Sequence, residues 1–97
     1  MLAERFCRQA LNAFPRDANL LCLLGASLIK QEKPKDAEHT LSRAVRIFND
    51  FSRAHEGLAE ALMMQGKLPE ALESLKRAAK LEPGSGSIRL KMAKVLT

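Results

Sequence analysis

The sequence contains no tryptophan and no tyrosine, and its only aromatic residues are four phenylalanines. Antiparallel β-sandwiches usually fill their pleated surfaces with aromatic and β-branched residues, so this composition disfavours that fold class. A membrane span is not expected, because the longest mostly apolar stretch, Leu20 to Ile29, is well short of the roughly 20 residues required. A secretory signal is not expected either, because Glu4, Arg5 and Arg8 interrupt the N-terminal segment.

Cysteine is also scarce. Cys7 and Cys22 have neither CxxC spacing nor a nearby histidine–cysteine set, so no metal site is expected. Disulfide-stapled secreted domains normally carry more cysteines, which favours reduced thiols and a cytoplasmic location. No cofactor is expected, because the Gly84–Ser87 segment lacks the preceding strand and the Lys-Ser/Thr ending of a phosphate-binding loop.

The chain does contain enough apolar residues for one small core. Of its 97 residues, 46% are hydrophobic, which separates it from disordered tails. The 16 Lys and Arg residues exceed the 11 Asp and Glu residues, giving a net charge of +5. A length of this order predicts a single domain over residues 1–97.

A period of 34 residues runs through the whole sequence. Within each unit the apolar residues have helical spacing: Ala37, Leu41, Ala44, Val45 and Phe48 occupy one face of a helix. This periodicity predicts six helices at about 2–14, 18–31, 35–48, 52–65, 69–81 and 87–96. The recurring columns include Ala3–Ala37–Ala71, Cys7–Leu41–Leu75, Ala10–Ala44–Ala78, Leu24–Leu58–Met92, Gly25–Ala59–Ala93, Leu28–Leu62–Leu96, Gln31–Gln65 and Lys33–Lys67.

Small residues at fixed columns predict close packing within each helix pair. Gly25, Ala59 and Ala93 allow the first helix to approach its partner, and Ala37 and Ala71 allow the partner to approach in return. Stacking such pairs produces a right-handed superhelix with a concave face.

Local signals mark the helix boundaries and the repeat frame. Pro34 and Pro69 fall at helix starts, where a missing N–H is tolerated, and Ser87 is expected to cap the last helix. The frame divides the chain into a half repeat at 1–17, full repeats at 18–51 and 52–85, and a half repeat or capping helix at 86–97. The terminal helices each lack a partner, so we expect the uncovered ends to promote self-association into a homo-oligomer.

These columns resemble the tetratricopeptide repeat, in the style of bacterial arrays. The resemblance implies an all-α, right-handed superhelical solenoid of antiparallel helix pairs. It also implies a non-catalytic scaffold or adaptor that binds a protein or peptide in its concave groove. The first full unit reads Leu21, Leu24-Gly25, Leu28, Ala37, Leu41, Ala44 and Asn49, with Asn49 where proline is usual. The second reads His55, Leu58-Ala59, Leu62, Ala71, Leu75, Ala78 and Pro83.

In that family the first helix of each pair lines the groove, and the matching positions here are implied to contact a partner. For Leu23 and Met63, packing between neighbouring helices is an equal alternative. Gly57 is expected to face outward from its pair, so that arginine there would block the groove with little effect on the fold. The implied positions are Asn19, Cys22, Leu23, Ala26, Ile29, Lys30, Arg53, Glu56, Gly57, Glu60, Met63, Met64, Ser87, Leu90, Lys91 and Lys94.

Two known uses of such grooves do not carry over residue by residue. The carboxylate clamp of chaperone-binding members would fall at Cys22, Ala26, Gly57, Ser87 and Lys91, which retain a single basic residue. The asparagine ladder of O-linked GlcNAc transferase arrays would fall at Leu23, Gly57 and Lys91, none of which is asparagine.

The sequence offers little for catalysis, and we expect no enzyme. His39 and His55 lie on different predicted helices with no serine or cysteine column beside them. His55 occupies a large packing position and is expected in the core, whereas His39 is expected at the surface. Glu56 and Glu60 share a helix face and are expected to be solvated.

Two alternative functions stay open. The chain could be an accessory array that presents substrates to an attached transferase-type enzyme domain, which rests on resemblance alone. It could instead bind RNA or an acidic protein through a basic surface on the second helices. Nucleic acid is disfavoured, because no aromatic residues interleave the charges to stack on bases. The basic residues are Arg5, Arg8, Arg43, Arg46, Lys76, Arg77 and Lys80.

Overall fold

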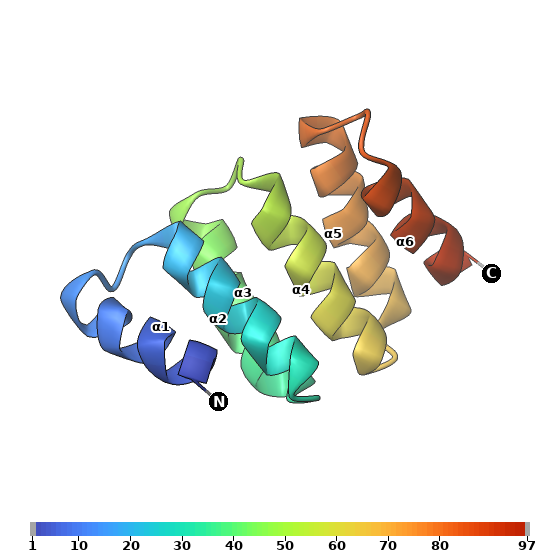
Figure 1. Ribbon diagram of the computed structural model, residues 1–97. Helices are drawn as coiled ribbons and strands as arrows, with labels where there is room; N and C mark the ends of the chain where they lie inside the picture. Colours follow the sequence, from blue (N-terminus) through green and yellow to red (C-terminus); the bar gives the residue numbers. More distant parts are fainter. Residues whose placement is uncertain (1, 97) are drawn as a thin grey trace.

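The computed structural model describes residues 2–96, which form six α-helices stacked in one array and no strand (Figure 1). Consecutive helices pack against each other, and α4 also contacts α2 and α6. The helices α2, α4 and α6 therefore form one layer, with α1, α3 and α5 in the other. The predicted all-α solenoid of helix pairs is confirmed, and each helix boundary lies within one residue of its expected position. The helices are α1 (Leu2–Ala13), α2 (Ala18–Lys30), α3 (Pro34–Ile47), α4 (Ser52–Met64), α5 (Leu68–Leu81) and α6 (Gly86–Leu96).

Helix starts follow the local signals, with one exception. Pro34 opens α3 and Pro69 lies in the first turn of α5, as predicted. Asp17 caps α2, because its Oδ1 atom accepts a hydrogen bond from the Leu20 amide at 3.1 Å. The cap expected at Ser87 was wrong: the Ile88 amide donates to Ser85 Oγ at 3.3 Å, and Ser87 already lies inside α6.

The turn inside each helix pair contains one residue with a left-handed backbone. Glu32, between α2 and α3, has a φ of 59°, and Gly66, at the same place between α4 and α5, has a φ of 76°. Glycine adopts this conformation without a steric penalty, whereas a side chain at Cβ is disfavoured there. The two turns therefore share a shape, but only the second has the residue suited to it.

Close helix approach centres on Leu41, which is buried between α2 and α4. A Cβ atom built on Gly25 would lie 2.5 Å from the Leu41 Cγ atom, so glycine is required for α2 to sit this close to α3. Ala37 and Ala44 on the facing side of α3 are fully buried. The predicted reciprocal approach of small residues is confirmed for this pair.

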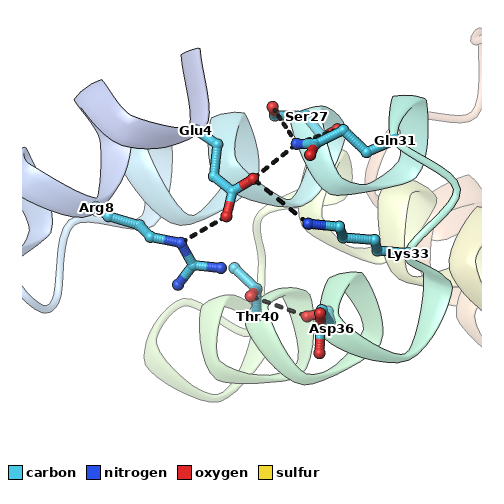
Figure 2. Close-up of polar contacts among 7 residues, drawn as sticks. All are labelled: Glu4, Arg8, Ser27, Gln31, Lys33, Asp36 and Thr40. Carbon is cyan, nitrogen blue, oxygen red and sulfur yellow. Dashed lines mark hydrogen bonds and ion pairs between the residues drawn. The ribbon is translucent and has the colours of Figure 1, made fainter. Parts of the chain in front are cut away.

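A polar contact links α1 to α2, and the same kind of contact links α3 to α4. The Gln31 side chain at the end of α2 donates to Glu4 Oε1 at 2.8 Å, and Arg8 Nε donates to Glu4 Oε2 at 2.8 Å (Figure 2). The contact recurs one repeat later, where Gln65 Nε2 donates to Glu38 Oε1 at 2.7 Å. The recurrence of glutamine at this column therefore reflects a repeated link between neighbouring pairs.

Candidate functional site

A cavity of about 380 Å³ lies along α2 and α4 and reaches α6. It is formed by the layer of first helices, the surface on which the groove was expected. Its depth comes from Gly57, which has no side chain and leaves the methyl groups of Leu41 at the floor. The lining residues are Cys22, Leu23, Ala26, Ile29, Lys30, Leu41, Arg53, Glu56, Gly57, Glu60 and Lys91, here called the α2–α4 groove.

The floor of the α2–α4 groove is apolar. Leu41 and Cys22 are buried, and burial raises the pKa of the Cys22 thiol to about 11, although the charge of Arg53 opposes this shift. The thiol is therefore neutral at pH 7 and behaves as a small apolar group. Cys7 is also buried, as predicted, in the same core cluster.

Gly57 points toward Leu41 on α3, in the preceding helix pair, so a side chain there would not be accommodated as freely as expected. A Cβ atom at this position would lie 3.2 Å from Leu41 Cδ1 and 3.4 Å from Leu41 Cδ2. These contacts are tight but less severe than those at Gly25. A large side chain at Gly57 would therefore disturb the packing of Leu41 as well as fill the groove.

The rim of the groove carries charges of both signs. Lys91 Nζ donates to Glu56 Oε2 at 2.5 Å, and Ser87 Oγ donates to the same oxygen at 2.5 Å. Burial alone would raise the pKa of Glu56, but hydrogen bonds from Lys91 and Ser87 outweigh it and hold that pKa below its ordinary value. The expectation of a solvated Glu56 was therefore wrong. No described residue forms an ion pair with Lys30, Arg53 or Glu60.

The two histidines lie where the sequence placed them. His55 is buried, with its Nε2 atom 2.8 Å from the Asn49 carbonyl oxygen, so it fastens the turn that precedes α4. His39 is exposed on α3. Between residues 2 and 96, no three His, Cys, Asp or Glu side chains are grouped closely enough to hold a metal ion.

A second cleft of about 540 Å³ lies at the edge of the array, between the α1–α2 and α3–α4 turns. Sequence reasoning missed it, because Phe48 was assigned to the inward face of its helix. In the structure Phe48 follows the last residue of α3 and is exposed. The signal in the sequence that could have indicated this cleft was the recurrence of phenylalanine at Phe14 and Phe48, which are one 34-residue repeat apart. The cleft is lined by Arg16, Asp17, Ala18, Asn19, Phe48, Asp50 and Phe51.

A profile of the tetratricopeptide repeat matches residues 22–86, which is more than half of the chain. The chain belongs to the tetratricopeptide repeat family. Searching the curated proteins gave no match. None of the helices described between residues 2 and 96 has the length and apolar character to cross a bilayer.

Solved structures share this tetratricopeptide repeat fold. The first TPR domain of the human RPAP3 protein superimposes with a TM-score of 0.94 at 21% identity, over 97% of this chain and 74% of that one. The first TPR of Spaghetti (RPAP3), bound to the HSP90 peptide SRMEEVD, superimposes with a TM-score of 0.93 at 20% identity, over 96% of this chain and 74% of that one. MamA superimposes with a TM-score of 0.89 at 25% identity, over 95% of this chain and 54% of MamA.

Some positions implied by the tetratricopeptide repeat frame lie outside the α2–α4 groove. Leu23 lines the groove and is 53% exposed. Met63 packs against the core cluster around α5, which is the alternative of packing between neighbouring helices. Asn19 lies at the edge cleft. Met64, Ser87, Leu90 and Lys94 are exposed and do not line the cavity.

The basic residues of the second helices are exposed, as expected of a solvated face. Two of them contact neighbouring parts of the chain. Arg8 pairs with Glu4, and Arg43 donates to the Pro15 carbonyl oxygen at 3.4 Å. Phe6, which is 65% exposed, lies between Arg5 and Arg8 on α1, so the expectation that no aromatic residue accompanies these charges was wrong at this end of the array.

Proposed function

We propose that this tetratricopeptide repeat chain is an interaction module that binds an extended peptide or a short helix of a partner protein in the α2–α4 groove. The observation that carries the proposal is the opening above Leu41, where Gly57 removes a side chain from the middle of the first-helix layer. A volume of about 380 Å³ suits a few side chains and falls in the range of roughly 300–1000 Å³ typical of ligand pockets.

Two structural neighbours support a peptide ligand. One is an RPAP3 TPR bound to an HSP90 peptide, and another is the second TPR domain of human RPAP3 in complex with the HSP70 peptide SGPTIEEVD. Their identity to this chain is 20% and 22%, so they support a peptide as the class of ligand and not the same peptide.

The groove chemistry favours a ligand led by apolar side chains. Leu23 offers an exposed apolar edge beside the buried floor, and burying a ligand side chain there removes apolar surface from water. Lys91 is the one basic residue at the chaperone-clamp positions, and Glu56 already neutralises it. A ligand carboxylate would therefore have to compete with Glu56, whereas an apolar side chain over Leu41 meets no such competitor.

The free charges at the rim supply orientation. Lys30 and Arg53 are exposed on α2 and α4, and Glu60 is half-buried on α4. Exposed charges of this kind affect association rate and register more than affinity. The proposed role is that of a non-catalytic adaptor that holds a partner through an apolar anchor and aligns it through these charges.

The test begins with selection of peptides from a random phage-displayed library on the immobilised chain. Selected peptides are then measured by fluorescence anisotropy against the wild type, Leu23→Asp and Met64→Asp. Leu23→Asp should weaken binding roughly tenfold or more, because it puts a charge against the apolar anchor. Met64→Asp is the matched control, since Met64 is exposed on the same helix layer but outside the groove. Equal affinity for all three proteins, or no selected peptide, would refute the proposal.

A further inference from the structure

The last helix exposes an apolar column that is buried elsewhere in the array. Leu28 on α2 is 0% exposed and Leu62 on α4 is 5% exposed. The second helices α3 and α5 pack directly against α2 and α4. Leu96 occupies the same column on α6 and is 68% exposed. The face of α6 that corresponds to these buried faces therefore lacks a second helix.

The first helix shows the reciprocal pattern. Ala37 and Ala71 are fully buried, on second helices that pack against the first helices α2 and α4. Ala3 occupies their column on α1 and is exposed. Phe6 is 65% exposed at the position where Thr40 is 7% exposed. The α1 face therefore lacks a first helix.

The two uncovered faces are complementary in type and lie at opposite ends of the molecule. α1 and α6 make no contact with each other, and Figure 1 places them at the two ends of the array. The α1 end lacks a first helix, and α6 is a first helix. The α6 end lacks a second helix, and α1 is a second helix.

We infer that a second copy of the chain covers these faces, with α6 of one copy packing on α1 of the next to complete a hybrid helix pair. Leu96 and Phe6 would contribute the apolar surface of the joint. Phe6 is larger than the Thr40 found at this position inside the array, so the joint is wider than an internal pair. The contact is heterologous, because two different faces meet, and it can therefore extend beyond a dimer.

Charge opposes this association and gives it a distinctive salt dependence. Arg8 is paired with Glu4 and Lys91 with Glu56, but Arg5 on α1 and Arg89 on α6 are exposed and leave positive charge on both helices. Salt screens repulsion between exposed like charges and leaves the apolar contact in place. Self-association should therefore strengthen as the NaCl concentration rises.

The test is sedimentation velocity of the full chain over a concentration series. The wild type should show a weight-average mass that rises with protein concentration. Phe6→Glu and Leu96→Glu should each raise the apparent Kd by roughly tenfold or more, because each places a charge in the apolar joint. Phe48→Glu, on another exposed phenylalanine that belongs to neither α1 nor α6, should leave the apparent Kd unchanged.

Mixing the two end variants distinguishes this joint from other dimers. Phe6→Glu retains an intact α6 face and Leu96→Glu retains an intact α1 face, so their equimolar mixture should form a dimer that stops at two chains. That recovery would also show that both variants are folded. A wild type that stays monomeric at every concentration would overturn the inference. So would loss of association in only one variant, the absence of a mixed dimer, or dissociation by added salt; each outcome is independent of peptide binding in the groove.

Discussion

Lys91 and Glu56 join α6 to α4 at the rim of the α2–α4 groove, with their charged atoms 2.5 Å apart. Both side chains are mostly shielded from solvent, at 22% and 21% exposure. The same carboxylate accepts a hydrogen bond from Ser87, so a single side chain on α4 holds two residues of the last helix. The pair thereby fixes α6 and neutralises a basic residue that a ligand would otherwise meet.

This relationship predicts a measurable coupling between the two residues. A double-mutant cycle with Glu56→Gln and Lys91→Met, followed by urea unfolding, should give an interaction free energy of about 0.5–1 kcal/mol. The value is modest because the pair is only partly buried. Strict additivity of the two substitutions would show that the contact does not stabilise α6.

The left-handed turn residues predict opposite effects of two glycine substitutions. Glu32→Gly should stabilise the chain by about 0.5–1 kcal/mol, because it relieves a side chain held at a φ of 59°. Gly66→Ala should destabilise it by about 1 kcal/mol, since no atom crowds that position and the cost comes from its φ of 76°. Urea midpoints of the two variants at pH 7 measure both changes. A loss of stability in Glu32→Gly would contradict the backbone argument.

The two helical glycines beside Leu41 predict a ranking. Gly25→Ala should destabilise the chain by about 1–3 kcal/mol, because its Cβ would lie 2.5 Å from Leu41 Cγ. Gly57→Ala should stay within about 1 kcal/mol of wild type, because a 3.2 Å contact is offset by the higher helix propensity of alanine. Thermal unfolding followed by circular dichroism gives the ranking, and equal losses would refute the close approach of α2 and α3.

Stability should fall in acid through three glutamates. The pKa values of the Glu4 and Glu38 carboxyls lie below the ordinary 4.5. The largest cause is the hydrogen bond from Arg8 at Glu4 and the hydrogen bond from Gln65 at Glu38. At Glu56 burial acts to raise the pKa, but hydrogen bonds from Lys91 and Ser87 prevail. A pKa lowered in the folded state means that the unfolded chain binds protons more readily. This stabilisation is therefore present above about pH 4.5 and is lost as the pH falls through the folded values.

The check is the urea midpoint at pH 7 and at about pH 3.5 for wild type and for a variant combining Glu4→Gln, Glu38→Gln and Glu56→Gln. The variant should be less stable at pH 7 and should lose less stability on acidification. Glu73→Gln, at an exposed glutamate on α5, is the control for removing a carboxylate outside these three contacts. Equal acid losses in the wild type and the triple variant would contradict the assignment.

The helices could be predicted closely because their signals are local. The 34-residue period and the prolines at 34 and 69 fix where each helix begins and which side it buries. The cap of α6 could not be chosen, because Ser85 and Ser87 are equivalent in sequence and only the backbone path selects between them. The left-handed backbone at Glu32 could not be predicted, because glutamate does not favour it, although the equivalent position one repeat later is Gly66.

The site was predicted less completely, because it depends on contacts between repeats. The family frame placed both Leu23 and Met63 among the groove positions of the first helices, yet the neighbouring helices leave Leu23 exposed in the groove and cover part of Met63. Likewise the partner of Glu56 lies one repeat away, on α6, and the pairing follows from side-chain reach rather than from sequence spacing. The recurring Glu4 and Glu38 column did contain the partner of the glutamine column, but the sequence alone gave no reason to join them.

The central claim is that a peptide ligand occupies the α2–α4 groove, and chemical-shift mapping tests it most directly. A peptide selected on the wild type is titrated into the ¹⁵N-labelled chain, and the backbone amide signals are followed by NMR. The account predicts that the largest changes occur at Leu23, Ala26 and Gly57, on α2 and α4. Changes confined to the second helices α3 and α5, or to the edge cleft around Phe48 and Asp50, would contradict it.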